Sequence, residues 1–208
     1  MYKYNDSFPM KRTLSPNDII SNHDFLVMRQ SFQTELMQTK RNRRIPVGDD
    51  ITFYFENHTT LWWQIQEMLR IEKGGHEQLQ DELAAYAPLV PQKFGDGSME
   101  LVATFMIEIE DIERRFRVLS QLGGIEHSII LHVNEQSVQA VPENDIERTN
   151  EFGKTSAVHF IRFRLSTPII DQFNQPESTV RLEITHPCYQ HQTRLSDTQK
   201  SALARDFI

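Results

Sequence analysis

Glu72 is one of three polar side chains that stand where the sequence pattern calls for an apolar residue. Residues 59–72 carry apolar side chains at spacings of three and four, which predicts an amphipathic helix. Glu72 lies three residues after Leu69 and four after Met68, so it continues the apolar stripe with a carboxylate. A carboxylate at such a position is costly to bury unless a cation or a hydrogen-bond donor pairs with it.

Two histidines occupy comparable positions in predicted strands, where successive side chains alternate between two faces. His159 belongs to the apolar set of the strand predicted over 157–165, and arginines occupy the opposite face. The strand predicted over 179–185 has an apolar set whose parity extends to His186. Both imidazoles are therefore expected to point into the protein.

Glu72, His159 and His186 together suggest a metal site, because neutral imidazole and carboxylate are suitable ligands for iron, zinc or manganese. One such ion is the candidate cofactor. The alternative is an ordinary core in which hydrogen bonds satisfy the histidines and an arginine pairs with Glu72. In both cases we expect the Glu72 carboxylate to lie near at least one imidazole, between the helix and the sheet.

The other reactive side chains form no recognisable motif. Cys188 is the single cysteine, so the chain cannot form an intrachain disulfide or a cysteine-based zinc or iron–sulfur site by itself. It follows Pro187 in a predicted loop and is interpreted as an ordinary cysteine. The spacing from His186 to His191 matches no zinc motif, and the Gly-x-Ser-x-Gly and His-Glu-x-x-His patterns are absent from the sequence.

Composition and charge narrow the class of protein. The 208 residues are 38% hydrophobic and 25% charged, with a net charge of −7, which is ordinary for a globular protein and unfavourable for binding nucleic acid. The basic cluster at residues 40–44 is interpreted as the cationic end of a helix. Because no apolar run resembles a signal peptide or a membrane span, we expect a cytoplasmic protein that has no membrane partner.

The chain order of the predicted elements favours an α+β fold. Residues 1–13 are expected to be a loose segment, and residues 14–208 a single domain. Helices are predicted after Ser21, over 59–72, 76–87 and 110–122, from Thr167, and after Ser196, and strands over 51–56, 99–109, 129–133, 137–141, 157–165 and 179–185. Strict β-α-β alternation and glycine-rich phosphate loops are missing. We therefore expect a largely antiparallel sheet of about six strands, with helices packed on it.

Several stretches resemble the uncharacterised bacterial family called domain of unknown function 3501. The resemblance covers nearly the whole chain from about Leu14. It is carried by residues 42–48 (NRRIPVG), 55–57 (FEN), 64–72 (QIQEMLRIE), 147–148 (ER), 155–160 (TSAVHF) and 186–191 (HPCYQH). The family has no assigned activity, so the resemblance transfers no catalytic residues.

The resemblance implies a role by association only. Genes of this family tend to lie beside those for rubrerythrin-like di-iron proteins and for iron–sulfur proteins of the heterodisulfide-reductase kind. This implies an accessory or partner protein of a redox or peroxide-defence system. The alternative is a metal-binding enzyme or sensor that uses a His/Glu site, so whether the protein is an enzyme stays open at this point.

Overall fold

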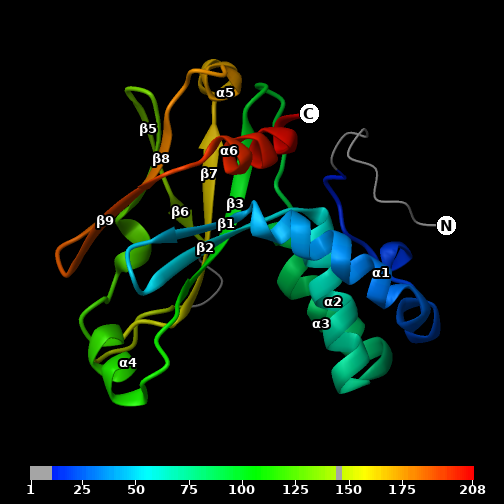
Figure 1. Ribbon diagram of the computed structural model, residues 1–208. Helices are drawn as coiled ribbons and strands as arrows, with labels where there is room; N and C mark the ends of the chain where they lie inside the picture. Colours follow the sequence, from blue (N-terminus) through cyan, green and yellow to red (C-terminus); the bar gives the residue numbers. More distant parts are fainter. Residues whose placement is uncertain (1–10, 144–146) are drawn as a thin grey trace.

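The computed structural model describes residues 11–143 and 147–208 of the chain, and its elements are shown in Figure 1. The helices are α1 (Asn22–Arg41), α2 (His58–Glu72), α3 (Gly75–Tyr86), α4 (Ile112–Leu119), α5 (Thr167–Asn174) and α6 (Asp197–Ala204). The strands are β1 (Arg44–Val47), β2 (Ile51–Glu56), β3 (Met99–Ile107), β4 (Ile129–Val133), β5 (Gln136–Gln139), β6 (Val141–Pro142), β7 (Val158–Leu165), β8 (Val180–His186) and β9 (Tyr189–Arg194).

The strands form two sheets in which every pair of neighbouring strands is antiparallel. The first sheet has the order β1-β2-β3-β7-β6, and the second has the order β5-β4-β8-β9. The α+β class and the antiparallel pairing expected from the sequence are confirmed. The strands divide between two sheets, however, and do not form one sheet of about six strands.

The two sheets pack against each other and enclose the larger of two hydrophobic cores. The inner face of the first sheet contributes alternate residues of β2 and β3, such as Phe53 and Phe105, and both are wholly buried. The second sheet contributes Leu131 and Leu182 from β4 and β8. This arrangement is a sandwich in which apolar side chains from both sheets fill the space between them.

Helices α1, α2 and α3 pack on the outer face of the first sheet and form a second core (Figure 1). Trp62 of α2 is the central member, since its ring contacts Phe25 and Phe32 of α1 at centroid distances of 6.0 and 5.2 Å. Its indole Nε1–H donates a hydrogen bond of 2.8 Å to the carbonyl oxygen of Asp18. The stripe predicted on this helix is therefore buried, and the helix packs on the sheet as expected.

Helix starts agree closely with the sequence signals. Asn57 caps α2 through a reciprocal pair of hydrogen bonds with Thr60, each 3.0 Å long. Ser21 and Ser196 cap α1 and α6 with their side-chain oxygens. Strand β1, by contrast, was not predicted, because Pro46 indicates a break. β1 is an edge strand, where a residue without an N–H group is tolerated.

The expected loose segment over 1–13 falls mostly outside the described residues, because the description begins at Lys11. Within the described part of the chain, no helix is long and apolar enough to cross a membrane.

A buried ion pair links the end of α1 to the C-terminal segment. The guanidinium of Arg43 donates to the Asp206 carboxylate, with an Nη1 to Oδ1 distance of 2.9 Å. The same group donates to the carbonyl oxygens of Phe55, Glu56 and Ala202. Both charged side chains are almost fully buried, at 4% and 3% exposure. Arg43 belongs to the basic cluster that was interpreted as a helix end, but it is a buried residue of the core.

We expect the substitution Asp206→Asn to destabilise the protein by about 3–5 kcal/mol, because it leaves the buried Arg43 charge without its counter-ion. Urea unfolding followed by tryptophan fluorescence measures this change. The control is Glu113→Gln, which removes an exposed ion pair with Arg117 and should change the free energy of unfolding by less than about 0.5 kcal/mol. Equal small effects for both variants would show that the buried pair does not stabilise the fold.

Candidate functional site

His159 points into the sandwich core, as strand parity predicts. Its side chain is wholly buried, and its ring stacks on Phe105 with a centroid distance of 4.5 Å and an interplanar angle of 2°. Its Nε2–H donates to the carbonyl oxygen of Ser156 at 2.9 Å, and the Thr155 hydroxyl lies 3.0 Å from the same nitrogen. The neutral ring therefore keeps its lone pair on Nδ1.

The Nδ1 atom of His159 faces a buried carboxylate. Glu126 Oε2 lies 3.7 Å away, and neither atom has a hydrogen-bond partner among the described residues. Burial lowers the pKa of His159, although the charge of Glu126 acts in the opposite direction. A carboxylate and an imidazole lone pair are both hydrogen-bond acceptors. The two atoms can therefore form a hydrogen bond only when one of the two groups carries a proton.

His186 is satisfied by the main chain at the end of β8. Its side chain is half-buried, and its Nε2 lies 3.3 Å from the carbonyl oxygen of Gly123. Its Nδ1 accepts a hydrogen bond of 3.2 Å from the backbone N–H of Cys188. Both ring nitrogens are thus used locally.

Glu72 lies away from both imidazoles, so the expected proximity is wrong. The residue is exposed in the last turn of α2, and its carboxylate accepts a hydrogen bond of 3.0 Å from Gln78. Helix α2 packs on the outer face of the first sheet, whereas His159 points to the inner face, so the sheet separates them. Among residues 11–143 and 147–208, no group of three or more His, Cys, Asp or Glu side chains is arranged to hold a metal ion.

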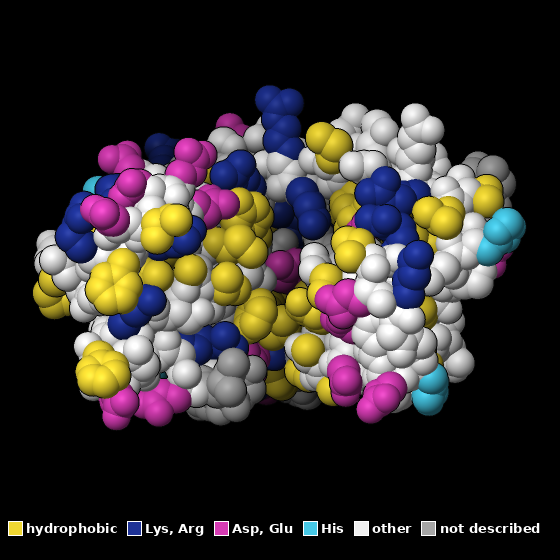
Figure 2. Space-filling model, turned by 90° about the horizontal axis from the view of Figure 1, so that it is seen from below, with side chains coloured by type: hydrophobic (Ala, Val, Ile, Leu, Met, Phe, Trp, Pro, Cys, Tyr) yellow, Lys and Arg dark blue, Asp and Glu magenta, His cyan; other side chains and the backbone are white. Residues whose placement is uncertain are grey.

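The structure instead presents a groove on the outer face of the first sheet, between the helical layer and α4. Figure 2 shows this hollow, with hydrophobic side chains within it and charged side chains around it. Tyr54 of β2, Thr104 of β3 and Phe160 of β7 are register partners in one row across the sheet, and Met106 lies in the next row. Tyr54, Met106 and Phe160 are half-buried. We refer to these four residues as the groove floor.

Two arginines stack on aromatic rings of the groove floor. The guanidinium of Arg44 lies 5.4 Å from the ring centroid of Tyr54, and that of Arg148 lies 5.0 Å from the ring centroid of Phe160. Contacts of this kind hold a charged group in place while leaving part of it exposed to solvent. Arg44 is 54% exposed.

Glu108 links Arg44 and Tyr54 at one end of the groove. Its carboxylate accepts a hydrogen bond of 2.7 Å from the Tyr54 hydroxyl and one of 3.3 Å from Arg44 Nη2. Burial and this hydrogen bond raise the pKa of Tyr54 to about 12. Burial acts to raise the pKa of Glu108, but hydrogen bonds from Tyr54 and Thr52 outweigh it and lower that pKa. The carboxylate is therefore a fixed anion at neutral pH.

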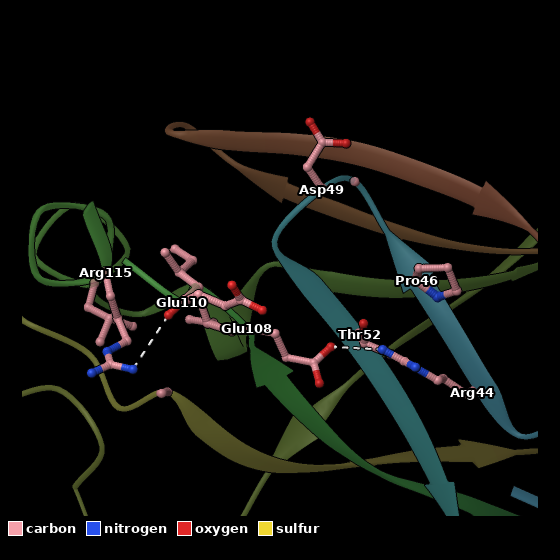
Figure 3. Close-up of a pocket in the computed structure, with 12 residues that line it drawn as sticks. Arg44, Pro46, Asp49, Thr52, Glu108, Glu110 and Arg115 are labelled. Atoms are coloured by element: carbon pink, nitrogen blue, oxygen red, sulfur yellow. Dashed lines mark hydrogen bonds and ion pairs between the residues drawn. The ribbon is translucent and has the colours of Figure 1, made fainter. Parts of the chain in front are cut away.

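A cavity of about 780 Å³ extends from Glu108 toward α4 (Figure 3). The Glu108 carboxylate points toward Arg44, whereas Asp49 points away from both. Arg115 of α4 lies at the other end of the cavity, and its Nη1 donates to the carbonyl oxygen of Ile109 at 3.4 Å. The cavity therefore has charges of both signs above an apolar base.

Sequence reasoning missed this groove for an identifiable reason. The alternation in residues 51–56 assigns Ile51, Phe53 and Phe55 to one face, and Thr52 and Tyr54 to the other. The polar and aromatic side chains of that second face are the feature of the sequence that indicates the groove. The sequence predicts that Arg44 belongs to the basic end of a helix, because Pro46 indicates a break, whereas Arg44 is the first residue of β1.

The pKa of His159 predicts how stability depends on pH. An unfolded chain protonates its histidines near pH 6.5, whereas burial lowers the pKa of His159 and also that of His58 in the folded protein. The unfolded state therefore binds more protons, and the free energy of unfolding should fall as the pH drops below about 6.5.

Urea unfolding between about pH 8 and pH 5 measures this decrease. His159→Gln should make it smaller, and His76→Gln, at an exposed position, should leave it unchanged. An identical pH dependence in wild type and His159→Gln would show that His159 is not responsible.

Comparison with known proteins identifies the family and supports the fold. The family model described as "Protein of unknown function (DUF3501)" matches residues 13–207. A solved structure described as a novel protein of unknown function from Burkholderia pseudomallei K96243 superimposes with a TM-score of 0.83, at 32% identity, covering 93% of this chain and 98% of the other. No protein with a curated description matches the sequence. The chain belongs to the DUF3501 family.

Proposed function

We propose that this protein is an accessory protein that binds a redox partner, a rubrerythrin-like di-iron protein or an iron–sulfur protein, through the groove. The identity of the partner rests on the gene association of the family to which the chain belongs. The mode of binding rests on the composition of the groove, which is the observation that carries the proposal.

The groove combines the residue types that are most enriched at protein interfaces. Its floor is aromatic and methionine-containing, and arginines stand at its edges. Tyr, Phe, Met and Arg are over-represented at such surfaces, where an apolar centre is surrounded by a polar rim. Tyr54 and Arg44 are also held by Glu108, so they lose little conformational freedom when a partner binds.

The charges at the edge of the groove are expected to orient a bound partner more than they increase its affinity. Arg44 and Arg115 stand close to Glu108 and Glu110 around the cavity, so the edge presents both signs within a short distance. A partner segment that places an apolar side chain on Met106 and Phe160 would meet these charges on one flank. Such charges at an interface fix the register of the partner and the rate of association more than the affinity.

A pull-down tests the proposal, with this protein as bait. The untagged candidates are the di-iron and iron–sulfur proteins whose genes lie beside the gene for this protein. We expect wild type to retain one of them. Met106→Glu should weaken retention at least about tenfold, because it places a charge in the apolar centre of the interface. Arg44→Glu should weaken it as well, by reversing a charge at the edge.

The matched control for Arg44→Glu is Arg41→Glu, which makes the same change three residues earlier in the chain, at an exposed position at the end of α1. This control should bind like wild type. Retention of no redox protein by wild type, or equal retention by all variants, would contradict the proposal.

The alternative of a metal-binding enzyme or sensor is tested by elemental analysis of protein purified without a histidine tag. Because Glu72 and His159 lie on opposite sides of the first sheet, we expect less than one equivalent of iron, zinc or manganese. A stoichiometric metal that is lost in His159→Ala would support the alternative instead.

A further inference from the structure

Ser137, His132 and Glu183 form a hydrogen-bonded chain on the outer face of the second sheet. The hydroxyl oxygen of Ser137 lies 2.9 Å from Nδ1 of His132, and Nε2 of His132 lies 2.6 Å from a carboxylate oxygen of Glu183. A hydroxyl, an imidazole and a carboxylate joined in this order are the parts of a serine nucleophile with its general base. None of the three lines the cavity beside the groove.

Three neighbouring strands place these side chains. His132 of β4 is the register partner of Ser137 of β5, and Glu183 of β8 is the register partner of Ile130, two residues along β4 from His132. Residues 134–135 form a two-residue turn between β4 and β5. Register partners one step away from such a turn form a non-hydrogen-bonded pair, whose side chains lie closest together. The serine hydroxyl therefore reaches the imidazole.

The hydrogen bonds fix where the protons lie. A carboxylate only accepts hydrogen bonds, so the neutral ring of His132 carries its proton on Nε2 and donates it to Glu183. The lone pair on Nδ1 then accepts a hydrogen bond from the Ser137 hydroxyl. The side chains of His132 and Glu183 are 12% and 31% exposed, whereas Ser137 is an exposed residue. A substrate from solvent can thus reach the hydroxyl while the base is partly shielded from water.

Two arginines continue the same row of side chains across the sheet. Arg181 of β8 is the register partner of His132, and Arg194 of β9 is the register partner of Arg181. Like charges that face each other across two strands repel. The Nε atom of Arg181 is also buried and has no hydrogen-bond partner among the described residues. An anionic group bound here would reduce the repulsion and accept hydrogen bonds from the guanidinium groups.

We propose that this row is an esterase site for small carboxylic esters that carry an anionic group. Ser137 is the nucleophile, His132 is the general base, and Arg181 and Arg194 bind the anion. Neighbouring strands lie about 5 Å apart, so β8 lies about 10 Å from β5. A small aromatic ester spans this distance together with an arginine side chain. Because Ser137 stands on the open surface of the sheet, few contacts help a poor leaving group to depart, which favours esters over amides.

The reaction is an acyl transfer to serine followed by hydrolysis. Ser137 Oγ attacks the ester carbonyl while His132 Nδ1 takes the hydroxyl proton, and Glu183 stabilises the imidazolium. His132 passes that proton to the leaving oxygen, the C–O bond breaks, and the alcohol departs from an acyl-serine. A water molecule then attacks the acyl group and gives one proton to His132, and the acid leaves as Ser137 recovers that proton.

A main-chain group is available for the oxyanion that forms during each attack. Because His132 and Ser137 are a non-hydrogen-bonded pair, the main-chain N–H of Ser137 points away from β4. β5 is an edge strand of the second sheet, so this N–H faces its free edge (Figure 1). It lies on the residue that carries the nucleophile, where a developing negative charge needs a donor.

Hydrolysis of 4-acetoxybenzoate and of its neutral methyl ester, followed by release of the phenol, tests the proposal. Wild type should hydrolyse both esters faster than buffer does, with the lower KM for the anionic ester. Ser137→Ala and His132→Gln should each lower kcat/KM at least about tenfold. The matched controls are Ser201→Ala and His76→Gln, which make the same changes at exposed positions elsewhere and should retain wild-type constants.

Glu183 is a positioning residue, and its variants separate this role from a structural one. Glu183→Gln should lower kcat at least about tenfold with little change in KM, because a glutamine amide donates to Nε2 and places the ring proton on Nδ1. Glu183→Asp should retain more of kcat than Glu183→Gln. Arg181→Gln should remove the preference for the anionic ester. Circular dichroism should show unchanged secondary structure in every variant.

A fluorophosphonate probe identifies the nucleophile, because an activated serine attacks its phosphorus and displaces fluoride. Peptide mass spectrometry should find the adduct on Ser137 in wild type and not in His132→Gln. An adduct only on other residues would overturn the proposal, as would a wild type that hydrolyses neither ester faster than buffer. Full activity in Ser137→Ala would also overturn it, since a histidine would then act alone. Equal KM values of wild type for the two esters would rule out anion binding by Arg181 and Arg194.

Discussion

The ion pair between Arg43 and Asp206 holds together the three parts of the molecule that meet near the groove. Arg43 lies between the end of α1 and the start of β1, and its guanidinium also binds the carbonyl oxygens of Phe55 and Glu56, where β2 leads into α2. Asp206 brings in the C-terminal segment. One buried charge pair therefore fixes two of the crossings between the first sheet and the helical layer, from α1 to β1 and from β2 to α2. Arg44, the next residue, points to the opposite face and enters the groove, so its position depends on the same anchor.

The first sheet is covered on both faces, but the two coverings are unequal. The second sheet covers the inner face, and the side chains of the first sheet that enter this core are apolar except for His159. The helices cover only part of the outer face, where Val102 joins the second core and Phe160 packs against that core at the border of the groove. The remainder carries Tyr54, Glu108 and their partners, and this is the groove. Partial coverage by the helices thus accounts for an apolar floor next to a charged edge.

The sequence predicts local structure well and the pairing of distant elements poorly. Capping residues such as Asn57 and Ser196 predict where helices begin, and alternation predicts that His159 is inward. When both faces of a sheet are covered, however, alternation does not show which of the two faces a buried side chain belongs to. The prediction that Glu72 and His159 meet failed for this reason, since α2 and His159 lie on opposite sides of the first sheet. The division of the strands into two sheets depends on which strands pair with each other, and alternation within one strand does not specify its partner.

A common physical cause explains why the sequence suggests a metal site at His159 and His186. In the structure, many partners of buried polar side chains are main-chain carbonyl oxygens. Arg43 binds three of them, His159 and His186 one each, and the buried Lys200 binds those of Pro176 and Ser178. Every residue has a carbonyl group, so these partners leave no signature in the sequence. A buried imidazole or ammonium group therefore looks unpaired until the backbone is folded around it, and only then can a structural polar residue be distinguished from a ligand.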